Sequence, residues 1–395
     1  MNLIRHPELR PVPEVVRTQP GWWRRLLADP AQAQVLWNSA DRLPLIGPAV
    51  TRDGVELVEV TFLAEGAPDT EWLVHLNSLT DRRRETLQPF RLERVPGTEL
   101  LGGTFLLPAD GVFSYRLTDI TGLPDDIGSD RSGWREVHGR GGPDPRNPQR
   151  LPTPLGGDAS VWTGPAAPWV DWPVSETDGW AETTRDGVMV RVLPGDERVV
   201  VCFDAEHWKG LGLGAAARAA GLRHTLVQVG SGNFEERGAT LTDPDRAAER
   251  LRLALRTASA VLGRDVRWAD VVAGQSFGGL AVGWVLAKHP DLARAGVVQS
   301  GSFWHRSAGD WGDEGPGDLL QLLQRGEADS ARPVIVQVGA EEGFMLPLSR
   351  AYRDVLLRRG AGDVGYREVR GGHDYAWWRA GLVDALGELE RCGYA

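Results

Sequence analysis

A serine between glycines, in Gly274-Gln275-Ser276-Phe277-Gly278, is the strongest candidate for chemistry in this sequence. An apolar run at residues 268–273 precedes it, and an apolar, helix-like pattern at residues 280–287 follows it. A G-x-S-x-G turn between a strand and a helix exposes a serine hydroxyl as a nucleophile above a parallel sheet. The glycines relieve the crowding that such a strained turn creates. The pattern predicts a nucleophile elbow at Ser276, with a glycine-rich structural turn as the alternative.

The base for this serine is expected among the histidines that follow it. A serine is a weak nucleophile until a histidine, itself oriented by an acid, takes its proton. In α/β-hydrolases the chain order is serine, acid, histidine. Of eight histidines, three follow the serine: His289 directly before a proline, His305, and His373 in Arg370-Gly371-Gly372-His373-Asp374. We predict His373 as the base, because its loop lies between the last strand-like run and the last helix.

The acid is expected in the loop after the preceding strand. The strand-like run at residues 333–338 leads into Gly339-Ala340-Glu341-Glu342-Gly343. The acid commonly lies about three residues past the glycine that ends the strand, here Gly339, which favours Glu342 over Glu341. We expect the other carboxylate to be solvated. Asp374 is adjacent to the predicted base in sequence and is badly placed to face its ring nitrogen.

An oxyanion hole requires two backbone N–H donors. One is predicted at Phe277, directly after the nucleophile. The other is expected in the turn after the apolar run at residues 199–203, where we favour Glu206, with Ala205 as the next candidate.

Composition limits the class of protein. The chain has 395 residues, of which 42% are hydrophobic and 25% charged, as in an ordinary soluble globular protein of about two domains. Its net charge of −10 argues against a nucleic acid or an anionic membrane as partner. Without a membrane-spanning run or a recognisable secretory leader, a cytoplasmic location is expected. Cys202 and Cys392 indicate neither a disulfide framework nor a metal site, and Cys202 is expected to be buried.

Two kinds of periodicity divide the chain. Residues 54–120 contain short, partly alternating strand patterns with frequent turns, which favour an antiparallel β-sandwich. Residues 122–175 are rich in Pro, Gly and Trp and are predicted to form a mostly irregular connector. Strand and helix patterns alternate from about residue 186 and indicate a mostly parallel sheet covered by helices. We predict a sandwich domain with its connector at residues 1–175 and an α/β-hydrolase domain at residues 176–395.

Four segments together resemble the enterochelin esterase family. They are AGQSFGGLA at residues 273–281, VVQSGSFW at 297–304, GGHDYAWWRAGL at 371–382 and DPRNPQ at 144–149. The resemblance covers most of the chain and implies a cytoplasmic serine hydrolase that cleaves catecholate siderophore trilactones. It implies a triad matching Ser276, Glu342 and His373, with neither a metal nor an organic cofactor in catalysis. It also implies that Arg237 matches an arginine lining the substrate site, with a solvated arginine as the alternative.

The resemblance implies a substrate that is a ferric catecholate siderophore similar to enterobactin. Such a complex is a trianion with aromatic faces, so its site should offer arginines and aromatic rings. We predict Arg237, Arg306, Trp304 and Trp208 as substrate contacts, although Trp304 in a purely core role is the alternative. The predicted reaction is hydrolysis of the trilactone esters through an acyl-enzyme, and the sequence does not fix an oligomeric state.

Two other functions compete with this interpretation. One is a general carboxylesterase for aryl, acetyl or carbohydrate esters, in which the sandwich serves as a carbohydrate-binding module. The other is a catalytically inactive hydrolase fold used for binding, which the ordered serine, acid and histidine disfavour.

Overall fold

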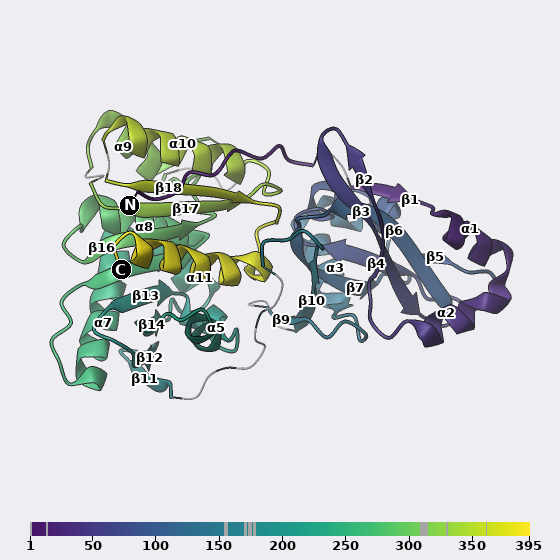
Figure 1. The fold of residues 1–395 in the computed structure, drawn as a ribbon, viewed down its shortest axis with the longest axis horizontal. Helices are drawn as coiled ribbons and strands as arrows, with labels where there is room; N and C mark the ends of the chain where they lie inside the picture. The colour runs from purple at the N-terminus through teal and green to yellow at the C-terminus, as the bar shows by residue number, and fades with distance from the viewer. Residues whose placement is uncertain are drawn as a thin grey trace. The chain divides into compact units, whose positions relative to one another are not determined.

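Two units of the chain fold around separate cores, one with antiparallel and one with mostly parallel strands (Figure 1). The computed structural model describes residues 2–12, 15–153, 157–169, 172, 176, 179–308, 315–328, 331–360 and 362–395. The α/β unit comprises residues 1–9, 171–369 and 377–395. The sandwich unit comprises residues 10–170 and 370–376.

The sandwich unit contains two antiparallel sheets, each of five strands among the described residues. The first has β1 (Val16–Thr18), β2 (Leu45–Arg52), β3 (Val55–Glu65), β5 (Glu93–Arg94) and β6 (Leu100–Pro108). The second has β4 (Trp72–Leu76), β7 (Val112–Asp119), β8 (Gly141–Gly142), β9 (Arg150–Pro152) and β10 (Asp158–Thr163). Side chains of both sheets share one core, in which the rings of Phe62 and Tyr115 meet at 4.8 Å. The antiparallel sandwich predicted from the sequence is confirmed.

The segment predicted as an irregular connector is more ordered than expected. It contains helix α3 (Arg131–Arg140) and strands β8, β9 and β10, and β10 pairs with β7 inside the sandwich. Trp162 of β10 is 2% exposed and stacks on Phe113 at 6.2 Å. Pro and Gly interrupt the hydrophobic pattern between these short elements. The pairing of β8 and β10 with β7 is a tertiary contact, which no local sequence pattern indicates. Residues 154–156, 170, 171 and 173–175 of the predicted connector lie outside the described residues.

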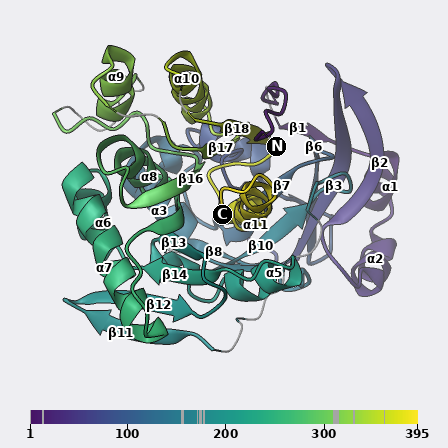
Figure 2. The ribbon, with the colours of Figure 1, turned by 60° about the vertical axis from the view of Figure 1, so that its left-hand side comes forward.

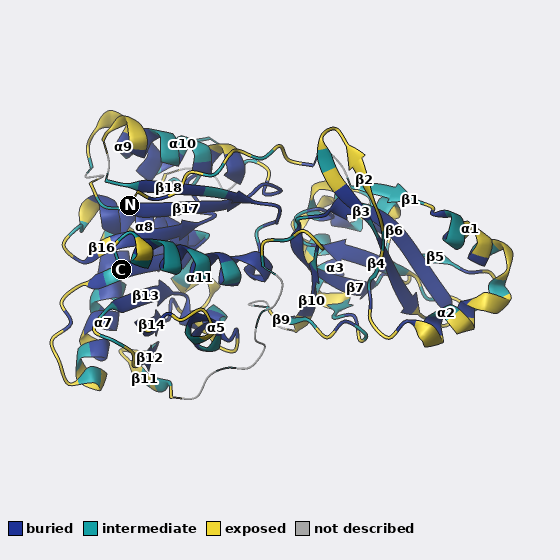
Figure 3. Ribbon diagram, viewed as in Figure 1, coloured by how far each residue is buried: buried dark blue, intermediate teal, exposed yellow. Residues whose placement is uncertain are grey.

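The α/β unit is built on an eight-stranded sheet of the described chain with the order β11-β12-β14-β13-β15-β16-β17-β18. The bounds are β11 (Ala181–Arg185), β12 (Val188–Leu193), β13 (Val199–Phe203), β14 (Thr225–Val229), β15 (Ala269–Gln275), β16 (Ala293–Gln299), β17 (Val334–Gly339) and β18 (Val364–Val369). All pairs from β14 to β18 are parallel, whereas β11 and β12 join the sheet antiparallel. Strands β13 and β17 are buried along their whole length (Figure 3). The predicted mostly parallel sheet is confirmed.

Helices cover both faces of this sheet. α7, α8 and α10 lie on one face, and α5 and α11 lie on the other (Figure 2). The helices are α4 (Ala205–Trp208), α5 (Leu213–Ala219), α6 (Phe234–Leu241), α7 (Pro244–Leu262), α8 (Phe277–Lys288), α9 (Asp318–Arg325), α10 (Met345–Arg358) and α11 (Tyr375–Arg391), with α1 (Gly21–Ala28) and α2 (Ala33–Ser39) in the sandwich unit. No described helix is long and apolar enough to cross a membrane.

Local signals define the ends of α7. Its N-cap residue, Asp243, accepts hydrogen bonds from the backbone N–H groups of Asp245 and Arg246, and Pro244 occupies the first helical position. Gly263 ends the helix in the left-handed conformation with φ of 64°. An acidic N-cap, proline at the first position and glycine beyond the end are the residues that such helix ends favour. The amphipathic pattern of residues 244–262 in the sequence predicts a helix, and the structure gives it the same bounds.

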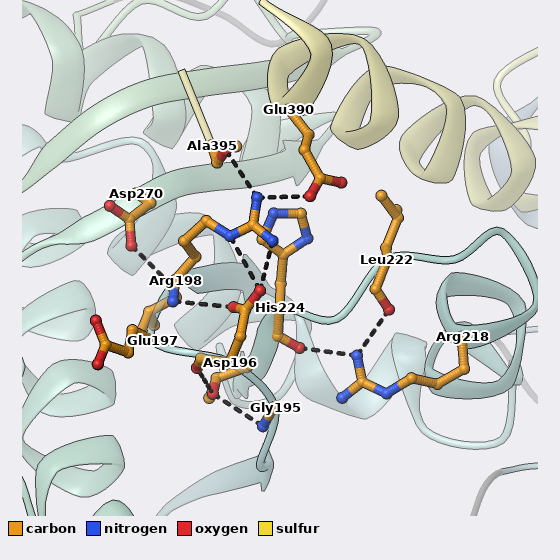
Figure 4. A network of polar contacts seen from close by, with 12 residues as sticks. Gly195, Asp196, Glu197, Arg198, Arg218, Leu222, His224, Asp270, Glu390 and Ala395 are labelled. Atoms are coloured by element: carbon orange, nitrogen blue, oxygen red, sulfur yellow. Dashed lines mark hydrogen bonds and ion pairs between the residues drawn. The ribbon is translucent and has the colours of Figure 1, made fainter. Parts of the chain in front are cut away.

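A polar network fixes the amino ends of the central strands (Figure 4). Arg198, just before β13, donates through Nη1 to Glu390 of α11 at 2.6 Å and through Nε to Asp196 at 3.0 Å. The backbone N–H of Val199 donates to Asp270 Oδ2 at 2.8 Å. These contacts attach the last turn of α11 to the start of β13.

Further along β13, Cys202 is completely buried, as expected from the sequence, and packs as a small apolar residue. Burial raises the pKa of its thiol to about 12.

Three buried glutamines cross the other end of the sheet. Gln275 of β15 donates to Gln299 of β16 at 2.8 Å, and Gln299 donates to Gln337 of β17 at 2.7 Å. The amide groups of Gln299 and Gln337 also donate to backbone carbonyls of α11, at Trp378 and Gly381. Buried polar groups are stabilising only when they are paired, so this ladder fixes the register of three strands and of α11 together.

Gln299→Leu should destabilise the protein by about 2–4 kcal/mol, because it leaves the partners of a buried amide unpaired. The free energy of unfolding, measured by urea denaturation, checks this expectation. Gln324→Leu on an exposed turn of α9 is the matched control and should change stability by less than about 0.5 kcal/mol. Equal effects of the two substitutions would contradict the structural role of the ladder.

Candidate active site

The carboxyl ends of five neighbouring parallel strands bring the candidate residues to one edge of the sheet. β13, β15, β16, β17 and β18 are adjacent and parallel, so the chain leaves each of them on the same side. Ligands of open α/β sheets bind at this edge. The residues that follow the strands are Asp204 after β13, Ser276 after β15, Ser300 after β16, Glu341 and Glu342 after β17, and residues 370–374 after β18.

Ser276 occupies the sharp turn between β15 and α8. Its φ of 57° and ψ of −120° place it in a conformation that residues with a side chain rarely adopt. Its N–H donates to the Gln299 carbonyl at 3.0 Å, and its own carbonyl accepts from Leu280 and Ser302. Its Oγ lies 3.4 Å from Ser302 Oγ. The predicted strand–turn–helix context of the serine is confirmed.

Close backbone packing requires glycine on both sides of this turn. A Cβ added to Gly274 would lie 2.2 Å from the carbonyl oxygen of Gly278. A Cβ on Gly279 would lie 3.0 Å from the carbonyl oxygen of Gln299 on the neighbouring strand. The helix therefore starts in contact with two strands, and side chains at these positions would push it away.

The two candidate acids have different surroundings. Glu342 accepts two hydrogen bonds at Oε1, one from Ser300 Oγ at 2.5 Å and one from the backbone N–H of Gly339 at 2.7 Å. Trp378 of α11 donates through Nε1 to Ser300 Oγ at 2.9 Å. Glu342 is thus held by donors from Gly339 at the end of β17 and from Ser300 just after β16, and Ser300 is itself held by α11. Glu341 is 1% exposed, so the expectation that the second carboxylate is solvated is wrong, because the loop turns back into the core directly after β17.

The loop that carries His373 is held by residues of the sandwich unit, to which residues 370–376 belong. The backbone N–H of His373 donates to Ser78 Oγ at 2.9 Å. Asp374 accepts from the backbone N–H of Ser114 at 2.6 Å and from that of Ala376 at 2.9 Å. Asp374 therefore holds this loop in place.

Two helix N-termini present backbone donors at this edge. The first N–H groups of a helix have no acceptor within the helix. Phe277 begins α8, which follows β15. Ala205 and Glu206 begin α4, which follows β13, the strand paired with β15. The carboxylate of Glu206 accepts from the backbone N–H groups of Ser231 and Gly232 at 3.0 and 3.2 Å, which fixes the start of α4. Both predicted oxyanion donors therefore lie at the starts of helices that follow two neighbouring strands of the sheet.

Two of the predicted substrate contacts are engaged within the protein. Arg237 of α6 forms a bidentate ion pair with the buried Asp204, with both N–O distances at 2.8 Å. Trp208 is completely buried, and its Nε1 donates to Gln275 Oε1 at 3.2 Å. Trp208 is buried next to the residue before Ser276, whereas a substrate contact has to lie at the surface. Its ring packs inside because α4 is a single turn that lies on the sheet.

The other two predicted contacts lie near an aromatic cluster. Trp304 is partly buried, with its ring 5.9 Å from that of Phe277 and 6.5 Å from that of Phe344. His305 lies edge-on to Phe277 at 5.8 Å, and burial lowers the pKa of its imidazole. Arg306 donates to the carbonyl of Pro316 at 3.1 Å. The arrangement places apolar rings directly beside the first residue after the serine.

Sequence reasoning missed three residues that organise this edge, Asp204, Ser300 and Ser302, and one that holds the loop of His373 within the sandwich unit, Ser78. Ser300 and Ser302 lie in the predicted family segment VVQSGSFW, and Asp204 directly follows the apolar run of β13. Ser78 has no local signal, because its role depends on a contact with residue 373. Within the described residues no group of three or more His, Cys, Asp or Glu side chains is placed to hold a metal ion.

Comparison with known proteins agrees with this architecture. The family model described as "Enterochelin esterase, N-terminal" matches residues 59–173, and the model described as "Putative esterase" matches residues 256–389. The iron(III) enterobactin esterase of Escherichia coli K12 is 27% identical over 387 residues, covering 87% of this chain and 94% of that protein. The iron(III) salmochelin esterase of E. coli O6:H1 is 27% identical over 391 residues, covering 90% and 93%.

A solved structure shares the same fold over both units. The crystal structure of enterochelin esterase from Shigella flexneri superimposes with a TM-score of 0.71 and 25% identity, covering 91% of this chain and 98% of that one. The fold and the comparisons define a carboxylic-ester hydrolase with an α/β-hydrolase unit. The chain belongs to the enterochelin esterase family.

Gly274→Ala should destabilise the protein by about 2–3 kcal/mol, because its Cβ would overlap the carbonyl of Gly278. Gly238→Ala in α6 is the matched control: no atom lies within 4 Å of its added Cβ, and alanine favours a helix interior. This control should stabilise the protein by about 0.5–1 kcal/mol. Urea denaturation of both variants measures the difference, and a tolerated Gly274→Ala would contradict the close strand–helix contact.

Proposed function

We propose that this protein hydrolyses the ester bonds of a ferric catecholate siderophore trilactone similar to enterobactin, and that this cleavage releases iron. The observation that carries the proposal is the match to iron(III) enterobactin esterases along 94% of their length, which includes both units. The aromatic cluster of Phe277, Trp304 and Phe344 supports it, because flat apolar rings suit catechol groups.

The proposed mechanism is acyl transfer through Ser276. Its Oγ attacks a lactone carbonyl while His373 takes the proton and gives it to the departing alcohol, which leaves an acyl-enzyme. A water molecule that His373 deprotonates then attacks the acyl-enzyme, and the proton returns to Ser276 Oγ as the acid is released. Glu342 holds the imidazole in the required orientation. Its fixed position supports this role, because a carboxylate with two donors on Oε1 presents Oε2 in one direction.

The oxyanion is proposed to bind two backbone N–H groups, those of Phe277 and Glu206, with Ala205 as the alternative for the second. Helix N-termini favour negative charge, and fixed donors of this kind contribute about 2.7–4 kcal/mol each to an acyl-transfer transition state. Arg306 is proposed as a contact for the anionic substrate.

Hydrolysis of ferric enterobactin by the full-length protein tests this function. We expect the wild type to convert it to linear catechol-bearing acids, separated by chromatography, and also to cleave p-nitrophenyl acetate. Ser276→Ala should lower kcat on both substrates by at least about 10³-fold with an unchanged melting temperature. Cleavage of the small ester without any cleavage of the trilactone would favour a general carboxylesterase instead. Retention of a tenth of the wild-type rate in the variant would refute Ser276 as nucleophile.

Replacement of the acids separately tests the triad assignment. Glu342→Gln should lower kcat by about 10²–10⁴-fold, because an amide does not stabilise the imidazolium. Glu341→Gln should leave kcat close to that of the wild type and act on the free energy of unfolding, since Glu341 is buried. Steady-state kinetics and urea denaturation of both variants decide the assignment. If Glu341→Gln loses activity while Glu342→Gln stays active, Glu341 is the triad acid and Glu342 is not.

A further inference from the structure

Asp204 ends β13 in an unfavourable backbone conformation. Its φ of 66° and ψ of 52° lie in the left-handed region, which a residue with a side chain adopts only where its surroundings hold it there. Its carbonyl accepts from the N–H groups of His207 and Trp208 at 2.9 and 3.1 Å, so this conformation starts helix α4. The direction of the Ala205 and Glu206 N–H groups therefore depends on the backbone of Asp204.

Arg237 is the group that holds Asp204. Its Nε and Nη2 donate to the two carboxylate oxygens in a bidentate pair, and the two side chains are 11% and 1% exposed. Burial alone would raise the pKa of Asp204, but the charge of Arg237 and its hydrogen bonds outweigh burial and lower it. The carboxylate is thus charged and fixed in a planar fork, the geometry that arginine provides and lysine does not.

The same pair contacts the elbow. Arg237 Nη2 lies 3.4 Å from the carbonyl oxygen of Gln275, the residue before the serine. The guanidinium lies 5.5 Å from the centre of the Phe277 ring. A Cβ on Gly278 would lie 3.1 Å from Asp204 Oδ2, so the carboxylate packs directly on the first turn of α8. One ion pair therefore contacts both turns that supply backbone donors.

We propose that Asp204 and Arg237 form a positioning pair for the oxyanion hole, which fixes the N–H groups of α4 relative to those of α8. This inference rests on the proposed acyl-transfer function. It assigns Arg237 a role through Asp204, in place of the direct substrate contact predicted from the sequence. A misplaced donor weakens transition-state binding for every ester, whereas a lost substrate contact affects only anionic substrates.

Loss of the pair should therefore lower kcat on a neutral ester and leave KM almost unchanged. Asp204→Asn keeps a residue that tolerates the left-handed conformation but removes the charge. Arg237→Gln removes the fork. We expect each variant to lower kcat for p-nitrophenyl acetate by about 10- to 100-fold, with KM within about twofold of the wild type. The double variant should lose little more than either single one, because the two residues act as one unit.

A second buried ion pair in the same unit provides the control. Arg350 of α10 donates through Nε and Nη2 to the two oxygens of Glu368 at 2.7 and 2.8 Å, and the Glu368 side chain is fully buried. Glu368→Gln and Arg350→Gln remove a bidentate pair of the same kind from β18 and α10. We expect them to lower the melting temperature as the Asp204 and Arg237 variants do, and to keep the wild-type kcat.

The experiment combines full-length variants, p-nitrophenyl acetate and ferric enterobactin, with melting temperatures and single-turnover acylation rates. A slow acylation step in Asp204→Asn and Arg237→Gln, and in neither control, supports the pair. Partial recovery of kcat in Arg237→Lys, which keeps the charge, is also expected. Wild-type kcat on the neutral ester together with a raised KM for the trilactone in Arg237→Gln would overturn the proposal in favour of a substrate contact. If the wild-type protein cleaves only the neutral ester, the siderophore assignment is refuted. The Asp204–Arg237 pair is still tested, because its effect is measured on the neutral ester.

Discussion

Backbone crowding at the carboxyl ends of three adjacent strands is the constraint on which the site depends. Asp204, Ser276 and Ser300 end β13, β15 and β16, and all three have positive φ, at 66°, 57° and 48°. Residues with side chains adopt such angles only where the surrounding structure holds them. The absence of side chains at Gly274 and Gly279 lets α8 start against the sheet, with Ser276 in the sharp turn between strand and helix.

Buried polar groups then hold these turns in register. The glutamine ladder of β15, β16 and β17 satisfies its own amides and two carbonyls of α11, while Ser300 connects Trp378 to Glu342. Each bond contributes a modest free energy, but a missing partner inside the core would be expensive. The result is an edge whose polar groups have little freedom to rearrange, and this preorganisation is what an acyl-transfer site requires.

The loop that carries His373 belongs to the sandwich unit. Residues 370–376 leave β18 of the α/β unit but are held by Ser78 and Ser114 of the sandwich. Ser78 itself has a φ of 62°, so its backbone is also constrained. The backbone of His373 is thus held by contacts within the sandwich unit.

The sequence by itself determined the two architectures, the elbow at Ser276 and the bounds of α7, because each of them follows from local periodicity, glycine spacing and caps. It also placed Glu342 in the loop after β17 and His373 in the loop after β18. Only the tertiary structure decided that β10 joins the sandwich, that Glu341 and Trp208 are buried, and that Arg237 is paired with Asp204. These features depend on residues at least 33 positions apart, or on a loop folding into the core. Local composition does not indicate a partner that lies far away in the sequence. A buried charge, however, is stable only when that partner is present.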